Sequence, residues 1–204
     1  MRRFVICLVI SLMGVCVSTS LGTTVYTDEA SFVAQLQPGY SLETFTGLGP
    51  WQYIGPDLDF GSGDYAGHAH AQLDVMWAIL EGAVTAGRSD DHILMTFGSA
   101  VTAVGGNFTA VDDVFMVVPS EIVLTLADST QVTTNSWGFV GFISPGAPIV
   151  SLDVFCPDGA LYGAIMPTID NIYTGSAIPE PEPSLLIALA GGLGSLLVLR
   201  RRRA

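Results

Sequence analysis

Hydrophobic and polar residues alternate along three segments of the chain, residues 92–97, 121–126 and 149–155. The hydrophobic positions that point the same way are Ile93, Met95 and Phe97, then Ile122, Leu124 and Leu126, then Val150, Leu152 and Val154. Alternate side chains lie on the same face of an extended strand, so a period of two is typical of a half-buried strand. The pattern predicts three β-strands, each with one face in the core.

A segment with the composition of a tight turn follows the second of these strands. Residues 127–130 read Ala-Asp-Ser-Thr and lead into residues 131–134. Asp and Ser favour tight turns because their side chains bond to nearby backbone amides. The arrangement predicts a β-hairpin.

One segment near the start of the chain has the pattern of a helix. Residues 28–36 place hydrophobic residues on one side and two acidic residues in the first turn, where they interact favourably with the helix dipole. Thr27 is the expected N-cap, and Pro38-Gly39 is the expected stop. Residues 73–80 fit either a strand or a buried helical turn.

Clusters of Gly, Pro, Asn and Asp separate many short segments across residues 23–177. This pattern is typical of two packed antiparallel sheets. We therefore predict an all-β, antiparallel two-sheet sandwich with one short N-terminal helix. The length of about 155 residues suits one domain with its own core. Cys156 is its only cysteine, so it has no internal disulfide, and a buried free thiol is expected.

The first 22 residues have the organisation of a signal peptide. Arg2 and Arg3 form a charged region, residues 4–17 are apolar, and small residues stand at Ser20 and Gly22. We expect a signal peptidase to cleave after Gly22, so that the protein is exported. A retained N-terminal anchor is the alternative, although the apolar stretch is short for a membrane span.

The last part of the chain, residues 178–204, has three components. A Pro-Glu-Pro-Glu-Pro-Ser stretch ends at Ser184, residues 185–199 are apolar, and residues 200–203 are all arginine. At about 1.5 Å per residue the apolar run makes a helix of roughly 22 Å, shorter than the ~30 Å hydrocarbon core of a bilayer. Arginines stay on the cytoplasmic side of a membrane, which places the preceding domain outside. The segment is expected to be a marginal transmembrane helix.

This order of elements resembles the PEP-CTERM sorting signal of Gram-negative bacteria. The resemblance implies a membrane-anchored precursor that is recognised by exosortase, a transpeptidase-like membrane enzyme, and then reaches the cell surface or extracellular matrix. The implied sorting motif is Pro181, Glu182, Pro183 and Ser184, and the implied cytoplasmic stop is Arg200, Arg201, Arg202 and Arg203. An ordinary membrane anchor without processing is the alternative.

The exported part is strongly acidic. Between residues 23 and 177 only Arg88 is basic, against seventeen Asp and Glu residues, so its formal net charge is near −16. Such a surface repels nucleic acids and anionic lipids, which excludes them as expected partners. It suits an extracellular protein that is kept soluble by charge, or one that binds Ca²⁺.

A second resemblance covers more of the chain. Residues 97–108, 124–128, 139–144, 148–152 and 170–173 are similar, in their order, to the ectodomain of many PEP-CTERM proteins. That ectodomain resembles a jelly-roll sandwich of the kind found in lectins and carbohydrate-binding modules. The resemblance implies a jelly-roll-like domain whose partner is extracellular polysaccharide.

Acidic residues are densest in residues 57–64. Asp57, Asp59 and Asp64 stand there with two glycines and form a candidate Ca²⁺ site, because carboxylate oxygens are the ligands that Ca²⁺ prefers. His68 occupies the position where an EF-hand needs a bidentate Glu, so the loop is not an EF-hand. A solvated acidic loop is the alternative. Further candidate oxygen ligands are Asp112, Asp113, Asp170 and Asn171, and nearby aromatic residues that could grip a sugar are Trp51, Tyr53 and Tyr65.

The histidines suggest a different ion. His68 and His70 share one face of an extended strand, and His92 follows about twenty residues later. Imidazole ligands suit zinc or copper. Two solvated histidines are the alternative.

No motif for nucleophilic catalysis or phosphate binding is present in the sequence. We therefore expect a non-enzymatic protein of the cell surface or matrix that binds or organises polysaccharide, with Ca²⁺ as the candidate cofactor. The alternative is a metal-dependent hydrolase acting on the matrix, with His68, His70 and His92 around the metal.

Overall fold

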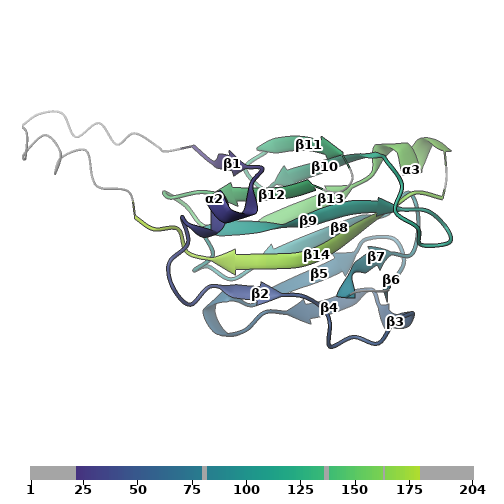
Figure 1. Ribbon diagram of the computed structural model, residues 1–204, viewed down its shortest axis with the longest axis horizontal. Coiled ribbons are helices and arrows are strands. Elements are labelled where there is room, and N and C mark those ends of the chain that lie inside the picture. Colours follow the sequence, from purple (N-terminus) through teal and green to yellow (C-terminus); the bar gives the residue numbers. More distant parts are fainter. Residues whose placement is uncertain (1–21, 80–81, 136–137, 163, 180–204) are drawn as a thin grey trace, which may run out of the picture.

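The computed structural model describes residues 22–79, 82–135, 138–162 and 164–179. These residues form two antiparallel β-sheets packed face to face, with only short helices (Figure 1). The all-β two-sheet sandwich is therefore confirmed. The predicted apolar helix of the tail and all of the predicted signal peptide except Gly22 lie outside the described residues. Among the described residues, no helix is long and apolar enough to span a membrane.

The first sheet has eight strands. Seven of them lie in the order β1 (Thr24–Tyr26), β12 (Gly138–Ile143), β9 (Ala103–Val111), β14 (Met166–Gly175), β7 (Val84–Ala86), β6 (Met76–Ala78) and β3 (Gln52–Gly55). The eighth, β2 (Ser41–Glu43), pairs with the later part of β14, whose first part pairs with β7. The ambiguous segment 73–80 thus contains a strand.

The second sheet has six strands. Their order is β11 (Gln131–Asn135), β10 (Glu121–Leu126), β13 (Ser151–Phe155), β8 (His92–Phe97), β5 (Gly67–Ala71) and β4 (Asp57–Phe60). Each neighbouring pair is antiparallel. One face of this sheet packs on the first sheet, and the other carries half-buried or exposed side chains.

The three alternating segments meet in one core. β8 and β10 have the predicted bounds, and their inward residues Ile93, Met95, Ile122 and Leu124 are fully buried. The third strand is shorter than predicted, because β13 begins at Ser151. Val150 was expected in the core and is instead 60% exposed, since it ends the loop before the strand, while Ile149 is buried.

The predicted hairpin is confirmed. β10 pairs with β11 in register, with Thr125 opposite Gln131. Ser129 has a φ of 68°, and Asp128 accepts a hydrogen bond from the backbone amide of Thr130 at 2.8 Å. The Asp side chain therefore closes the turn in the way that the composition indicated.

The predicted N-terminal helix exists but is a single turn, α2 (Glu29–Val33). Asp28, not Thr27, is its N-cap, because the Asp28 carboxylate accepts a hydrogen bond from the amide of Ser31 at 2.8 Å. Two further short elements were not predicted, the 3₁₀ turn η1 (Gly63–Tyr65) and the helix α3 (Pro157–Tyr162).

The buried ring of Phe32 packs helix α2 against the first sheet, and Tyr173 of β14 also donates a hydrogen bond to Glu29 of this helix. Phe32 is fully buried and packs over two glycines, Gly105 of β9 and Gly141 of β12. A Cβ atom at Gly141 would lie 2.4 Å from the Phe32 ring, and one at Gly105 would lie 3.0 Å from it. The glycines therefore leave the space that the ring fills.

Cys156 is a buried free thiol, as predicted. Burial, together with the nearby Asp158 carboxylate, raises the pKa of this thiol to about 12. The thiolate form is thus scarce at neutral pH, which suits a packing role and not a reactive one.

Candidate binding site

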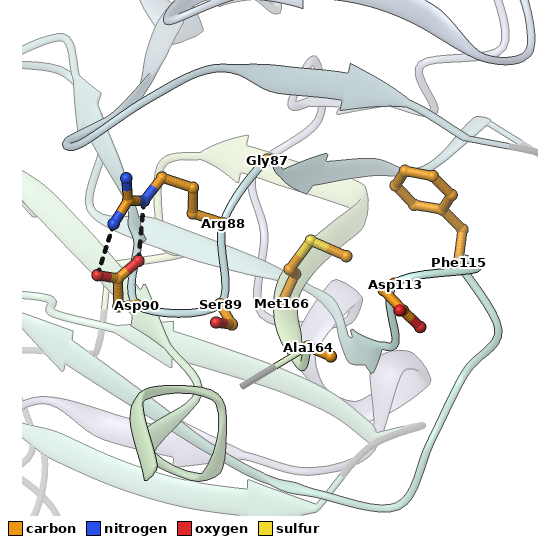
Figure 2. Close-up of a pocket in the computed structure, with 8 residues that line it drawn as sticks. All are labelled: Gly87, Arg88, Ser89, Asp90, Asp113, Phe115, Ala164 and Met166. Atoms are coloured by element: carbon orange, nitrogen blue, oxygen red, sulfur yellow. Dashed lines mark hydrogen bonds and ion pairs between the residues drawn. The ribbon is translucent and has the colours of Figure 1, made fainter. Parts of the chain in front are cut away.

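A shallow cleft of about 420 Å³ lies where β14 begins and β7 ends (Figure 2). Its lining residues are Gly87, Arg88, Ser89, Asp90, Asp113, Phe115, Ala164 and Met166. The volume is within the range of small-molecule sites in proteins, about 300–1,000 Å³. The cleft combines charged and apolar side chains, as such sites do.

One wall of the cleft is the loop between β7 and β8. Arg88 donates two hydrogen bonds to Asp90, from Nε to Oδ1 and from Nη2 to Oδ2, both at 2.9 Å. The hydrogen bonds from Arg88 hold the pKa of the Asp90 carboxyl below its usual value. The only arginine between residues 23 and 177 is thus oriented at this cleft by a planar, two-bond contact.

The opposite wall is the loop that follows β9. Figure 2 shows Asp113 and Phe115 across the cleft from Arg88, with Met166 between the two walls. Asp112 shapes this loop, because its Oδ1 accepts hydrogen bonds from the amides of Val114 at 3.1 Å and Met116 at 2.8 Å. Phe115 has a φ of 61°, a region that bulky residues rarely adopt. The turn therefore fixes the backbone at Phe115 in an unusual conformation. The Phe115 ring lies beside the cleft.

Aromatic side chains extend the site beyond the cleft. Trp51 packs against Phe115 with ring centroids 5.2 Å apart, and Tyr53 packs edge-on against Trp77 at 5.4 Å. Trp51 is 48% exposed and Tyr53 57% exposed. The backbone of Trp51 also has a positive φ, 60°. We call Trp51, Tyr53, Trp77 and Phe115 the aromatic surface.

The aromatic surface is continuous with the cleft. Phe115 belongs to both, and the Trp77 indole nitrogen lies 3.4 Å from the point where a Cβ of Gly87 would be. Large apolar rings beside carboxylates and a guanidinium can stack on a sugar ring while the polar groups bond to its hydroxyls.

Comparison with protein-family models, curated proteins and solved structures finds no match. The arrangement of side chains is therefore the basis for assigning this site a role.

The sequence had singled out two of these aromatic residues for a different reason. Trp51 and Tyr53 were grouped with the acidic residues 57–64, whereas the structure places them by the cleft. Tyr65, the third member of that group, packs against the core, and its hydroxyl donates to Ser176 Oγ at 3.2 Å. Sequence reasoning missed Phe115 and Arg88 as site residues, although a lone arginine in so acidic a domain was an available signal.

The predicted calcium ligands are spread over two elements. Asp57 and Asp59 lie on β4, facing His70 and His68 across the strand pair, while Asp64 lies in η1. The described residues contain one group of three or more candidate metal ligands whose donor atoms all lie within 4.8 Å of one another, namely Asp57, His68 and His70. Calcium binding by Asp57, Asp59 and Asp64 stays a prediction.

The other proposed oxygen ligands serve local structure. Asp112 closes the turn described above, and Asp113 lines the cleft. Asn171 donates a hydrogen bond to the neighbouring Asp170 at 3.0 Å, where the register of β14 shifts. None of these aspartates joins the group of close candidate metal ligands found among the described residues.

The three histidines face the same side of the second sheet, but they form two sites. His68 and His70 contact Asp57, at 3.1 Å and 2.8 Å. His92 lies apart from them, stacked on Phe155 at 4.1 Å and bonded to Asp153 at 2.8 Å. The expectation that His92 joins the other two around one ion is therefore not met in this arrangement.

In the first of these sites, hydrogen bonds shift the pKa values of His68 and Asp57. The hydrogen bond between His68 and Asp59 is the main cause of a raised pKa at the imidazole. The hydrogen bond to Asp57 also raises this pKa, whereas desolvation lowers it. Bonding to His70 is the main cause of a lowered pKa at Asp57.

Proposed function

We propose that this chain is an exported, non-enzymatic protein of the cell surface or extracellular matrix whose sandwich domain binds polysaccharide. The observation that carries the proposal is the aromatic surface, with Trp51 and Tyr53 exposed and Trp77 and Phe115 half-buried, beside a cleft with Arg88, Asp90 and Asp113. Contiguous apolar surface that is rimmed by polar residues marks interaction sites in proteins. Fixed backbone turns at Trp51 and Phe115 support a role in recognition, since strained conformations cluster at functional sites.

The fold supports this proposal only in general terms. A jelly-roll-like arrangement of the two sheets is part of the proposal, and such sandwiches host many functions, so function has to be argued from the site. The acidic charge favours neutral or cationic sugars, because an anionic polymer would need a bridging cation. Ca²⁺ at Asp57, Asp59 and Asp64 remains the candidate cofactor of the proposal, at a place outside the cleft.

Replacing Trp51 with alanine is expected to weaken polysaccharide binding about fivefold or more. One aromatic contact contributes about 1 kcal/mol, which corresponds to roughly fivefold in affinity. The measurement is retention of the full-length chain, in mild detergent, on the extracellular polysaccharide of the source bacterium, with Ca²⁺ and with a chelator.

Tyr40→Ala is the matched control, because Tyr40 is 37% exposed but contacts Tyr173 of β14, away from the aromatic surface. Its retention should equal that of the unchanged protein. Equal retention of Trp51→Ala and the unchanged protein would place the sugar contact elsewhere. Absence of retention in either buffer would refute polysaccharide binding.

The sorting part of the proposal has its own test. We expect that protein taken from the cell surface lacks residues 185–204 and is cut at or near Pro181 to Ser184. The reason is the Pro-Glu-Pro motif before a short apolar run and four arginines. Intact-mass measurement and C-terminal peptide sequencing check this result. Finding the arginine cluster on most surface-exposed molecules would instead indicate an unprocessed membrane anchor.

A further inference from the structure

We propose that Asp57, His68 and His70 bind a divalent transition-metal ion on the outer face of the second sheet. Their donor atoms all lie within 4.8 Å of one another. This site is separate from the aromatic surface, since it lies on β4 and β5 and none of its residues lines the cleft.

Regular strand pairing brings the three ligands together. Asp57 of β4 is directly opposite His70 of β5, and Asp59 is opposite His68. His68 and His70 are two residues apart and therefore share the outer face of β5. Between them, Ala69 is fully buried and fixes the strand against the core. The ligands are thus held by a packed sheet and not by a loop.

The distances are close to those of a metal site. Asp57 Oδ1 lies 2.8 Å from His70 Nδ1 and 3.1 Å from His68 Nε2. Two donors bound to one ion at about 2.1 Å, with an angle of about 90–110° between them, are roughly 3.0–3.4 Å apart. Movements of a few tenths of an ångström therefore suffice to admit the ion.

A second carboxylate orients one of the ligands. His68 Nδ1 lies 2.8 Å from Asp59 Oδ1, and a carboxylate can only accept a hydrogen bond. When Nδ1 carries the proton, the lone pair of Nε2 points at Asp57 Oδ1, which is also an acceptor. A proton on Nε2 satisfies this contact in the metal-free protein, and a metal ion between the two atoms takes the place of that proton. The Asp–His–ligand arrangement is the outer-shell pattern that metal sites commonly use.

The donor types select the class of metal. Two imidazoles and one carboxylate suit Zn²⁺ and its neighbours, whereas Ca²⁺ prefers an all-oxygen set. The side chains of His68 and His70 are 41% and 42% exposed. Solvent or an external ligand can therefore complete the coordination, as in zinc sites with three protein ligands.

The test uses the full-length chain in mild detergent, without a polyhistidine tag and stripped by a chelator. Titration with Zn²⁺ is followed by calorimetry, and titration with Co²⁺ by its visible absorption, which reports the ligand geometry. We expect one equivalent of each ion to bind saturably. The variants His70→Ala and Asp57→Asn should each lower affinity roughly tenfold or more, and Asp59→Asn, which changes only the outer shell, about tenfold.

His92→Ala is the matched control. His92 lies on the same face and is also paired with an aspartate, but it is outside the group. The affinity of the His92→Ala variant for Zn²⁺ should equal that of the unchanged protein. The proposal is overturned if His92→Ala loses as much affinity as His70→Ala, or if no saturable binding occurs in the folded protein.

A further measurement separates folding from binding. Thermal unfolding of each variant is recorded with and without Zn²⁺, and the ion should raise the midpoint of the unchanged protein more than that of Asp57→Asn. A variant that fails to fold is replaced by His68→Gln, which keeps a polar side chain at a half-exposed position. Equal Zn²⁺-dependent shifts in all folded variants would also overturn the proposal.

Discussion

Replacing Phe32 with alanine is expected to lower the free energy of unfolding by about 3–5 kcal/mol, as for other buried phenylalanines. The ring is fully buried and contacts Tyr26, Phe139 and Tyr173, with centroids 5.4–6.2 Å away. It is the buried side chain of α2, so its loss leaves a cavity and removes the packing of the helix on the sheet. Chemical denaturation of the purified chain, followed by circular dichroism, measures the change.

Ala30→Ser is the control on the same helix, because Ala30 is exposed, and its effect should stay within about 0.5 kcal/mol. A double-mutant cycle tests the packing argument directly. Gly141→Ala alone should destabilise the protein, since the new Cβ would lie 2.4 Å from the Phe32 ring. In the Phe32→Ala background the same change should cost much less. Additive effects would show that the ring does not occupy the space above Gly141.

The long strands could be predicted from the sequence because each buries alternate residues. β8 and β10 are five or more residues long and show this period clearly. Strands such as β1, β6 and β7 have three residues each, too few to show a period. The start of β13 was placed too early because Val150 extends the hydrophobic alternation by one position although the chain is still in a loop there.

The candidate sites could be predicted where a single strand carries the information. The spacing of His68 and His70 placed both on one face, and the structure agrees. Asp57 was proposed as a ligand in a different set, since only the register of β4 against β5 shows that it faces His70. The aromatic surface depends on three separate segments, and Phe115 stands between Val114 and Met116 in a short hydrophobic stretch that carries no motif.

The second large effect is expected at Asp91, where replacement by alanine should destabilise the protein by about 3–5 kcal/mol. Asp91 is fully buried, and its carboxylate accepts hydrogen bonds from the amides of Leu73 at 2.8 Å, Asp74 at 3.1 Å and His92 at 2.8 Å. Alanine would leave three backbone donors without this partner, and each bond to a charged acceptor contributes about 1.5–3 kcal/mol, with incomplete additivity.

The neighbouring residue provides the control for this prediction. Asp90 is a carboxylate on the same loop, but it is exposed and paired with Arg88, and surface ion pairs contribute about 1 kcal/mol or less. Denaturation of Asp90→Ala should therefore resemble that of the unchanged protein, while Asp91→Ala unfolds at much lower denaturant. The two variants remove the same group from adjacent positions, so a difference between them reports burial and backbone bonding, not charge. Equal, small effects would mean that solvent satisfies the three amides once the carboxylate is gone.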